Sequence, residues 1–315
     1  MSDEVLVTGA AGFIGGHLTR SCADDGFRVT AIDPRPLPPG VAAATGLRGR
    51  ADSSGLLRDV RAGRYRAVVH QGGITTTTAT DCTALLDHNV EQPLALAEAC
   101  ADSNTLFVYA SSHSVYGGII GRVAVAEGDE DDPERCSGPL NRYALSKLAL
   151  DRAMAGRVSD GLPWVGLRYT NVFGAGEGHK GAMASIISQL LRDAAHEGTL
   201  RLFADTLTAS RDYVPVETVT RVLRWLLAHP VPPGVYNLGS GSPVSFATLL
   251  EWCADFAGSR GVRVQLVPNE FASSYQYWTC ADTTRLRAVV PILEPMGTAD
   301  LRAAASALFR HFASR

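Results

Sequence analysis

The sequence predicts an α/β fold in which a doubly wound parallel sheet carries a smaller α/β lobe. In its first half, short β-branched runs alternate with stretches of helical pattern, which predicts parallel strands joined by crossover helices. The runs are mainly apolar, as expected of strands covered on both faces. The expected strands comprise residues 5–7, 29–32, 67–70, 106–109 and 164–167.

Helical patterns fill the intervals between these strands. A helix is expected from about Gly12, and another over residues 84–101. Pro93 lies inside the second pattern and would kink that helix or mark a later start, because proline lacks the backbone donor that a helix interior uses. Both helices therefore fit the crossover positions of a parallel sheet.

The pattern loosens after about residue 172, where glycines crowd a loop. Helical stripes then recur near 186–191 and 219–227, the second ended by Pro230, and a third helix is expected from the capping residue Ser245 to Gly258. We expect residues 1–172 and about 211–240 to form the sheet domain. The lobe would comprise about 173–210 and 241–315.

Composition restricts the classes of function. With 315 residues, 46% of them hydrophobic, the chain can bury a large core. A net charge of −3 argues against nucleic acid and anionic membranes as partners. No apolar run is long enough to span a bilayer, and the N-terminus does not resemble a signal peptide. The six cysteines are scattered, which favours a reduced cytoplasmic protein without a structural metal.

A glycine-rich turn follows the first expected strand and opens the first expected helix. Glycines allow the tight turn and the close approach of a pyrophosphate, which the helix N-terminus stabilises. Asp33, at the end of the second strand, would accept hydrogen bonds from an adenosine ribose. Asp33 favours NAD over NADP, although Arg35 could bind a 2′-phosphate. The turn contributes Gly9, Gly12, Phe13, Ile14 and Gly15.

Tyr143 and Lys147 would lie one helical turn apart, on one face of a helix. A free phenol has a pKa of about 10. A nearby cation in a desolvated site lowers that pKa by roughly 1–3 units, so we expect Lys147, aided by a bound nicotinamide, to make Tyr143 a usable base. Ser112, just past a strand, would hydrogen-bond the reacting hydroxyl. These three residues are the candidate catalytic set.

Only two of the 29 basic residues are lysines, Lys147 and Lys180. Where nearly every cation is arginine, the exceptions are expected at sites that need a compact, tunable amine. Lys180 is therefore, like Lys147, expected at a site that needs an amine.

Taken together, these motifs resemble the ADP-glycero-manno-heptose 6-epimerases, a branch of the extended short-chain dehydrogenases/reductases with a Rossmann domain. The glycine spacing is that of the extended class, and the likeness spans almost the full length. The most specific stretch is residues 177–181, because generic sugar epimerases do not share it. The other matching stretches comprise residues 70–73, 75–78, 109–112, 115–118, 139–143, 168–172, 183–185, 211–214, 236–239 and 275–276.

The resemblance implies an NAD(P)-dependent epimerase acting on a nucleotide-diphosphate sugar. A hydride leaves a carbinol carbon while Tyr143 takes the hydroxyl proton, and the hydride returns to the other face of the ketone. Lys180 would be the second acid/base, opposite Tyr143. The cofactor-binding residues that it adds are Asp52, Gln71, Gly72 and Asn89. The implied substrate-binding residues are Ser112, His113, Ser114, Asn171, His179, Lys180, Phe203, Arg211 and Tyr275.

Two departures from the family pattern leave alternatives open. Ser273 and Ser274 stand where the family has Gly-Arg, so a cationic contact to the diphosphate is missing. His113 and Ser114 replace two small apolar residues. Because a polar residue at the Ser114 position is typical of sugar 4-epimerases, inversion at C4 remains an alternative to C6.

Two further functions are less favoured. A 4,6-dehydratase would carry an Asp-Glu pair where this chain has His113 and Ser114. A non-catalytic NAD-binding regulator would not need the tyrosine–lysine pair. The resemblance also implies a homo-oligomer, with a dimer favoured and a larger ring as the alternative.

Overall fold

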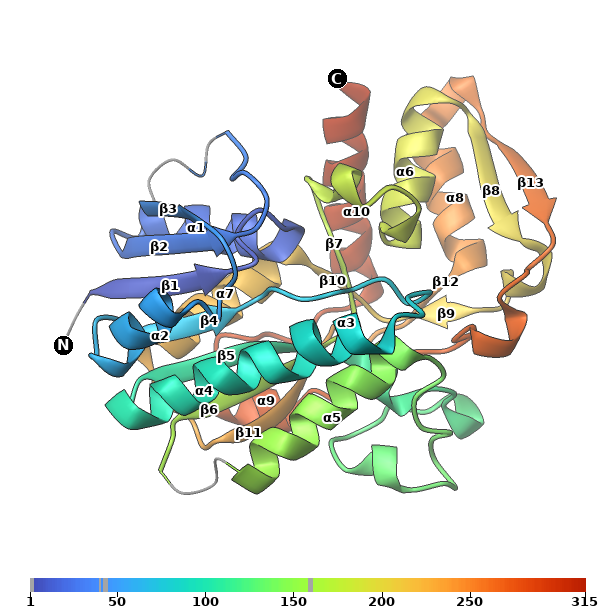
Figure 1. Cartoon of the computed structure of the whole chain (residues 1–315). Helices are drawn as coiled ribbons and strands as arrows, with labels where there is room; N and C mark the ends of the chain where they lie inside the picture. Colours follow the sequence, from blue (N-terminus) through green and yellow to red (C-terminus); the bar gives the residue numbers. More distant parts are fainter. Residues whose placement is uncertain (1–2, 40, 42–44, 158–160) are drawn as a thin grey trace.

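The computed structural model describes residues 3–39, 41, 45–157 and 161–315 (Figure 1). Seven parallel strands form the main sheet in the order β11-β6-β5-β4-β1-β2-β3. The chain turns from one side of β1 to the other between β3 and β4, which places a topological switch point beside β1. The strands are β1 (Glu4–Thr8), β2 (Arg28–Asp33), β3 (Thr45–Arg48), β4 (Ala67–His70), β5 (Leu106–Ser112), β6 (Trp164–Tyr169) and β11 (Gly234–Leu238).

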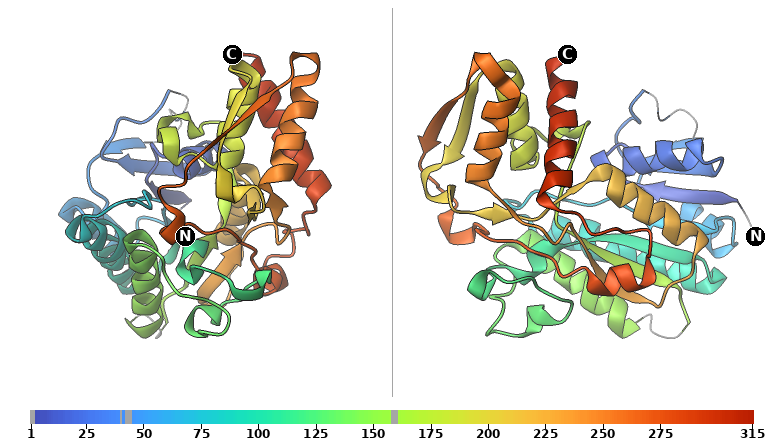
Figure 2. Two further views of the ribbon diagram at one scale, coloured as in Figure 1. Left: turned by 90° about the vertical axis from the view of Figure 1, so that its right-hand side faces the viewer. Right: turned by 180° about the vertical axis from the view of Figure 1, so that it is seen from behind.

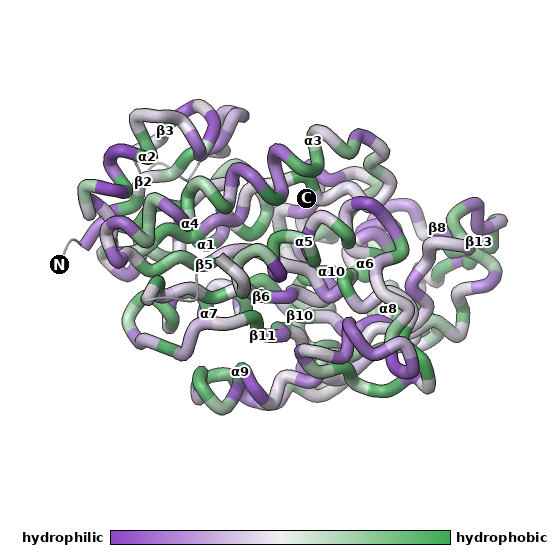
Figure 3. The backbone as a smooth tube through the Cα atoms, turned by 60° about the horizontal axis from the view of Figure 1, so that its bottom comes forward, coloured by the Kyte–Doolittle hydropathy of each residue, from purple (hydrophilic) through white to green (hydrophobic). Residues whose placement is uncertain are grey.

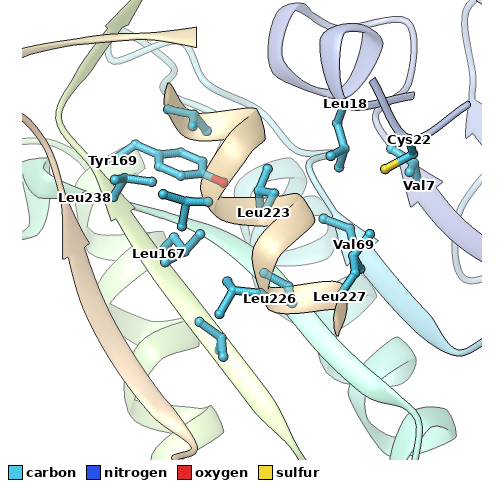
Figure 4. Packing of buried hydrophobic residues seen from close by; sticks show 14 of the residues in the cluster. Val7, Leu18, Cys22, Val69, Leu167, Tyr169, Leu223, Leu226, Leu227 and Leu238 are labelled. Carbon is cyan, nitrogen blue, oxygen red and sulfur yellow. The ribbon is translucent and has the colours of Figure 1, made fainter. Parts of the chain in front are cut away.

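Helices cover one face of the sheet through apolar stripes (Figure 4). α1 (Phe13–Asp24) contributes Leu18 and Cys22, and α7 (Val216–Ala228) contributes Leu223 among others. α9 (Thr284–Val289) adds Leu286 to the same core. The strand residues facing them are buried apolar side chains, so this face is closed to water.

The opposite face is covered by α2 (Ser54–Arg61), α4 (Gln92–Ser103) and α5 (Arg142–Arg157). Leu150 of α5 and Leu96 of α4 are fully buried there, against strand residues such as Phe107. Burial on both faces explains the continuous apolar runs of the strands. The predicted doubly wound sheet is confirmed.

The helix expected over residues 84–101 consists of three parts. α3 (Cys82–Leu86) leads into a π-helical turn, η1 (Asp87–Glu91), and then into α4, where Pro93 stands in the first turn. The π turn has a wider spacing of backbone hydrogen bonds than an α-helix, and it directly precedes the turn that contains Pro93, which has no backbone N–H to donate. Pro93 therefore marks the point where the π-helical turn gives way to α4, while the helical segment as a whole begins at Cys82 and not later than expected.

A lobe lies beside the carboxyl ends of the strands (Figure 2). Its helices α6 (Ile186–His196), α8 (Phe246–Ala257) and α10 (Thr298–Ala313) share one apolar core with the parallel pair β8 (Thr199–Phe203) and β13 (Arg263–Val267). The predicted division into domains stays a prediction. Residues 284–293, assigned to the lobe from the sequence, pack Leu286, Val290 and Leu293 into the core of the sheet.

Two short strand pairs connect lobe and sheet. β7 (Asn171–Phe173) pairs with β10 (Tyr213–Pro215), and β9 (Ser210–Arg211) pairs with β12 (Val244–Ser245). Hydrophilic residues interrupt the apolar ones along the whole backbone (Figure 3). Among the described residues, no helix has the length and apolar character needed to cross a membrane.

Candidate active site

Between β1 and α1, the chain is packed too tightly for a side chain at Gly9 and at Gly15. Gly9 has a φ of +65°, and a Cβ there would lie 2.5 Å from the Gly72 backbone nitrogen. A Cβ on Gly15 would lie 2.2 Å from the Gly9 carbonyl oxygen. The N-cap residue of α1 is Gly12, which has no side chain to satisfy the amides of the first turn. These amides are therefore available to an anion.

A cavity of about 550 Å³ opens at the carboxyl ends of β1, β2 and β4, beside the switch point. The predicted residues Gly9, Gly12, Phe13, Ile14, Gly15, Asp33, Gln71 and Gly72 all line it. The buried Gln71 Nε2 has no hydrogen-bond partner within the described part of the chain, while Gln71 Oε1 accepts from the Tyr169 hydroxyl at 3.1 Å. A glycine cradle, free helix amides and an unsatisfied amide donor suit a dinucleotide.

Asp33 is buried at the end of β2 and engaged on both carboxylate oxygens. Oδ2 accepts from the Ala11 backbone N–H at 3.1 Å, and Oδ1 accepts from the Arg35 N–H at 2.9 Å. The Arg35 guanidinium, itself more than half exposed, also donates from Nε to Oδ1 at 3.1 Å. Both residues that bear on the choice between NAD and NADP thus stand at the cavity as one ion pair.

Arg50 lines the same cavity and was not anticipated from the sequence. It makes a two-pronged contact with Asp52 (2.9 and 2.8 Å) and another with Asp87 (2.7 and 2.8 Å). Asp52, which also accepts from Gln92 at 3.2 Å, serves here mainly to hold Arg50 and Gln92, two lining residues. The nearest signal in the sequence was the Arg-x-Asp spacing of 50–52.

Asn89 lies just behind the Gly73 part of the cavity wall, and its contact with the cofactor stays a prediction. Its side chain is fully buried, exchanges hydrogen bonds with the Ile74 backbone (2.8 and 2.9 Å) and donates to Ser146 Oγ at 3.0 Å. A Cβ on Gly73 would lie 2.7 Å from Asn89 Oδ1. The π-helical turn therefore fastens the 71–76 loop to α5.

Tyr143 and Lys147 are buried on one face of α5 at the end of β5. Lys147 Nζ donates to the Ala110 carbonyl oxygen at 2.9 Å and lies 3.6 Å from where a Cβ on Gly73 would be. Burial lowers the pKa of Lys147 to about 8. Gly73 lines the cavity, so the ammonium stands directly behind its wall.

The expected lowering of the Tyr143 pKa by Lys147 and a bound nicotinamide stays a prediction. Burial raises the pKa of Tyr143, and a hydrogen bond with the Ser112 side chain opposes the rise. The physical reason is desolvation, which disfavours the phenolate and the ammonium alike.

Ser112 ends β5 and receives two hydrogen bonds from Ser114. The Ser114 backbone N–H donates to Ser112 Oγ at 3.1 Å, and the Ser114 hydroxyl donates to the same oxygen at 2.8 Å. The intervening His113 is buried, and its ring centre lies 4.8 Å from that of Tyr116. Ser112 is thus oriented from one side by Ser114 and contacts Tyr143 on the other.

A buried ionic network links α5, which carries Tyr143 and Lys147, to the end of β5. Asp151, one turn beyond Lys147, accepts from the Tyr109 hydroxyl (3.0 Å), the Ser111 hydroxyl (2.9 Å) and Arg168 Nε (2.8 Å). Arg168 also donates to Glu130 at 2.6 Å. The network joins α5 to the end of β5 and was missed in the sequence, where single charged residues carry no signal of their partners.

Lys180 lies on a short 3₁₀ segment, η5 (Glu177–Met183), at the rim of the cavity. Its Nζ is 3.1 Å from Glu177 Oε1 and 4.6 Å from the centre of the Phe13 ring. His179 also lines the cavity, and its Nδ1 contacts the Gly176 carbonyl oxygen at 3.0 Å. The two lysines therefore approach one cavity from different elements.

The remaining candidate substrate residues lie on the lobe side. The Arg211 guanidinium stacks over the Tyr275 ring at 4.9 Å, and the Phe203 and Tyr275 ring centres are 5.9 Å apart. The Asn171 amide donates to the Asp212 carbonyl oxygen (3.0 Å) and to Thr279 Oγ1 (3.3 Å). Both donor bonds of Asn171 are thus made within the protein, whereas the guanidinium of Arg211 is placed by the face of the Tyr275 ring.

Comparison with known proteins decides the family. The model of the NAD dependent epimerase/dehydratase family matches residues 5–239. The chain belongs to this family. An ADP-L-glycero-D-manno-heptose-6-epimerase of Alkalilimnicola ehrlichii is 33% identical over 298 residues, which is 90% of this chain and 90% of the relative.

Two solved structures share the fold. This member of the epimerase/dehydratase family superimposes on the Helicobacter pylori ADP-L-glycero-D-manno-heptose-6-epimerase with a TM-score of 0.85 at 24% identity, covering 100% and 97% of the two chains. It superimposes on MoeE5 in complex with UDP-glucuronic acid and NAD with a TM-score of 0.81 at 28% identity, covering 98% and 99%.

NAD is the cofactor of this family, and the cavity fits it. The glycine turn would hold the pyrophosphate, Asp33 the adenosine ribose, and Lys147 the nicotinamide side. Within residues 3–39, 41, 45–157 and 161–315, no three His, Cys, Asp or Glu side chains are placed to hold a metal ion. The six cysteines, all in the described part, are free thiols.

Proposed function

We propose that this enzyme is a nucleotide-sugar epimerase that inverts a carbinol centre through a transient keto-sugar. The observation that carries the proposal is that Lys180 lines the cavity while the ammonium of Lys147 stands behind its wall at Gly73, on the helix that also carries Tyr143, the hydrogen-bond partner of Ser112. A dehydrogenase needs one proton-transfer group, whereas inversion through a flipped ketone uses one for each face. Lys180 supplies a second such group from another element.

Each residue has a part that its position supports. NAD, when bound, would supply the hydride chemistry, taking a hydride from the carbinol carbon and giving it back to the opposite face. Tyr143 takes the hydroxyl proton as the ketone forms, and Ser112 holds the reacting oxygen. Lys147 keeps a positive charge beside the phenol. After the ketone turns over, the Lys180 ammonium donates a proton to its oxygen.

An ADP-heptose is the first candidate substrate, with inversion at C6, because relatives of that name match most of the chain. Arg211 would bind the diphosphate through its guanidinium fork. Phe203 and Tyr275, close to Arg211, would contact the nucleotide. Ser273 and Ser274, in place of Gly-Arg, leave Arg211 as the main cation of this clamp.

Inversion at C4 is the second candidate. Ser114 is polar and hydrogen-bonded to Ser112, so a hydroxyl stands beside the reacting oxygen where the heptose branch has a small apolar residue. A 4,6-dehydratase is disfavoured because His113 and Ser114 do not offer a paired acid and base. A cytoplasmic location and a homo-oligomer, with a dimer favoured, remain predictions from the sequence.

The test is incubation of the purified enzyme with ADP-heptose, and separately with UDP-glucose, in deuterated buffer, with the products read by NMR. The C6 proposal expects the epimeric heptose, with no solvent deuterium at the inverted carbon because the hydride is returned directly. A C4-inverted product would establish the second candidate. Absence of any epimer with both sugars, from protein shown to bind NAD, would overturn the epimerase proposal for these sugar classes.

A further inference from the structure

The Lys180 ammonium is fixed from two sides. Glu177 Oε1 lies 3.1 Å from its Nζ, and the Phe13 ring centre lies 4.6 Å away. About a quarter of the side chain is exposed, on a residue that lines the cavity. A free lysine would sample many rotamers, so these two contacts define where the amine stands.

Glu177 is itself anchored. Its side chain is only 2% exposed, and Oε2 accepts from the Ser185 backbone N–H at 3.2 Å and from the Ser185 hydroxyl at 2.7 Å. Ser185 is the N-cap residue of α6, and its own hydroxyl oxygen accepts a hydrogen bond from the Ser188 backbone N–H. The helix is therefore capped without a carboxylate. A buried charge at this position requires a partner, and Lys180 provides it.

The loop that carries both residues is docked on the first turns of α1. His17 Nε2 contacts the Ala175 carbonyl oxygen at 2.8 Å, and the Phe13 and His17 rings meet edge to face at 5.4 Å. A Cβ on Gly174 would lie 3.5 Å from the Phe13 ring. Phe13 also lines the cavity. Its contact with Lys180 therefore fixes the position of the Lys180 amine relative to the cofactor-binding turn.

We propose that Glu177 is a positioning residue that holds the Lys180 ammonium where it can donate a proton to the keto-sugar. The inference rests on the proposed function, in which Lys180 is the second acid/base. Proton transfer falls steeply with misplacement, and a shift of about 1 Å can slow a reaction about 100-fold. Loss of the Glu177 charge should therefore slow inversion without slowing oxidation.

The experiment separates the two halves of the reaction in Glu177→Gln, Lys180→Ala and the double variant. Oxidation is followed as the absorbance of reduced nicotinamide on mixing with substrate, and inversion by NMR. We expect Glu177→Gln to oxidise at the wild-type rate and to invert about 10–100-fold more slowly. Glu197→Gln, which changes an exposed acid at the opposite, C-terminal end of α6, is the control and should change neither rate.

Chemical rescue is a measurement that would not depend on Glu177 if the role of this residue were only structural. Added ethylammonium should restore part of the inversion lost in Lys180→Ala, because Glu177 can bind the small cation in the vacated place. The double variant should not be rescued. The inference would be overturned if ethylammonium rescued Lys180→Ala and the double variant equally. It would also be overturned if oxidation and inversion slowed to the same extent in Glu177→Gln.

The outcomes also distinguish the inference from the proposed function. If Lys180→Ala inverts at the wild-type rate, the second acid/base is wrong and the proposed function fails in that part. If Lys180→Ala loses inversion but Glu177→Gln does not, only the role of Glu177 is refuted. Should Glu177→Gln not fold, Glu177→Asp makes the same comparison, because it keeps the buried charge while withdrawing it from the ammonium.

Discussion

Arg168 Nε lies 2.8 Å from the Asp151 carboxylate, and both side chains are only 3% exposed. Asp151→Asn would leave the guanidinium buried with Glu130 as its remaining anion. Breaking a buried pair from one side costs about 3–5 kcal/mol, so we expect a loss of that size in the free energy of unfolding, measured with urea. Asp131→Asn, in the exposed pair with Arg152, is the control and should change little. An equal effect of both substitutions would contradict the special role of the buried pair.

Replacement of Tyr143 by phenylalanine tests the proton-transfer role. The ring would still fill its buried position, but the hydroxyl that contacts Ser112 would be gone. Loss of a general acid/base typically slows a reaction about 100–10,000-fold, and we expect a fall in that range. Bound NAD, quantified after denaturation, should match the wild-type content. Turnover close to wild type would refute the catalytic assignment.

Asp33→Ser should change the preference between NAD and NADP. The carboxylate now neutralises Arg35 and would repel a 2′-phosphate; its removal frees the guanidinium to bind one. We expect NAD affinity to fall by about tenfold, equivalent to one charge-assisted hydrogen bond, and NADP affinity to rise. Titration of cofactor-stripped protein with each dinucleotide measures both changes. Arg35→Ala should lack the gain in NADP affinity, and an unchanged preference in Asp33→Ser would count against the role of this pair.

His113 predicts an acid-sensitive stability. Burial, with the nearby Arg168 and Arg211 charges, lowers its pKa to about 4, against about 6.5 for an unfolded histidine. The unfolded chain therefore takes up the proton first, so this contribution is complete above pH 6.5 and is lost as the pH falls towards 4. Unfolding free energies at pH 7 and pH 5 should differ less in His113→Gln than in the wild type. The exposed His196→Gln should keep the wild-type difference; the same slope in all three proteins would contradict the prediction.

Ser114→Ala tests how Ser112 is oriented. The substitution removes the 2.8 Å hydrogen bond from the Ser114 hydroxyl and keeps the backbone donor. One neutral hydrogen bond contributes about 0.5–1.5 kcal/mol, so we expect sugar oxidation to slow by about three- to tenfold. The rate is read from reduced nicotinamide. If oxidation is unaffected, Ser114 contributes to the sugar pocket alone or not at all.

Local patterns predicted much of the fold because burial on both faces leaves a readable apolar run in each central strand. β3 was not anticipated, because it is exposed along its length and lies at the sheet edge. The π-helical turn was also missed, since its hydrogen-bond spacing has no residue signature beyond Pro93. In the site, the glycine turn and the Tyr143–Lys147 spacing were recognisable because both depend on residues close in sequence.

The sequence by itself determined the parallel sheet, the dinucleotide-binding turn and the two lysines as residues of interest, because each depends on neighbours within a few positions. Only the tertiary structure decided which distant groups meet. It joined Asn89 to Ile74 and Ser146, introduced Arg50, placed Asp151 against Arg168 and paired Glu177 with Lys180. The physical reason is that the hydration, charge and orientation of a buried polar group depend on whichever segments fold around it, and these contacts leave no periodic trace along the chain.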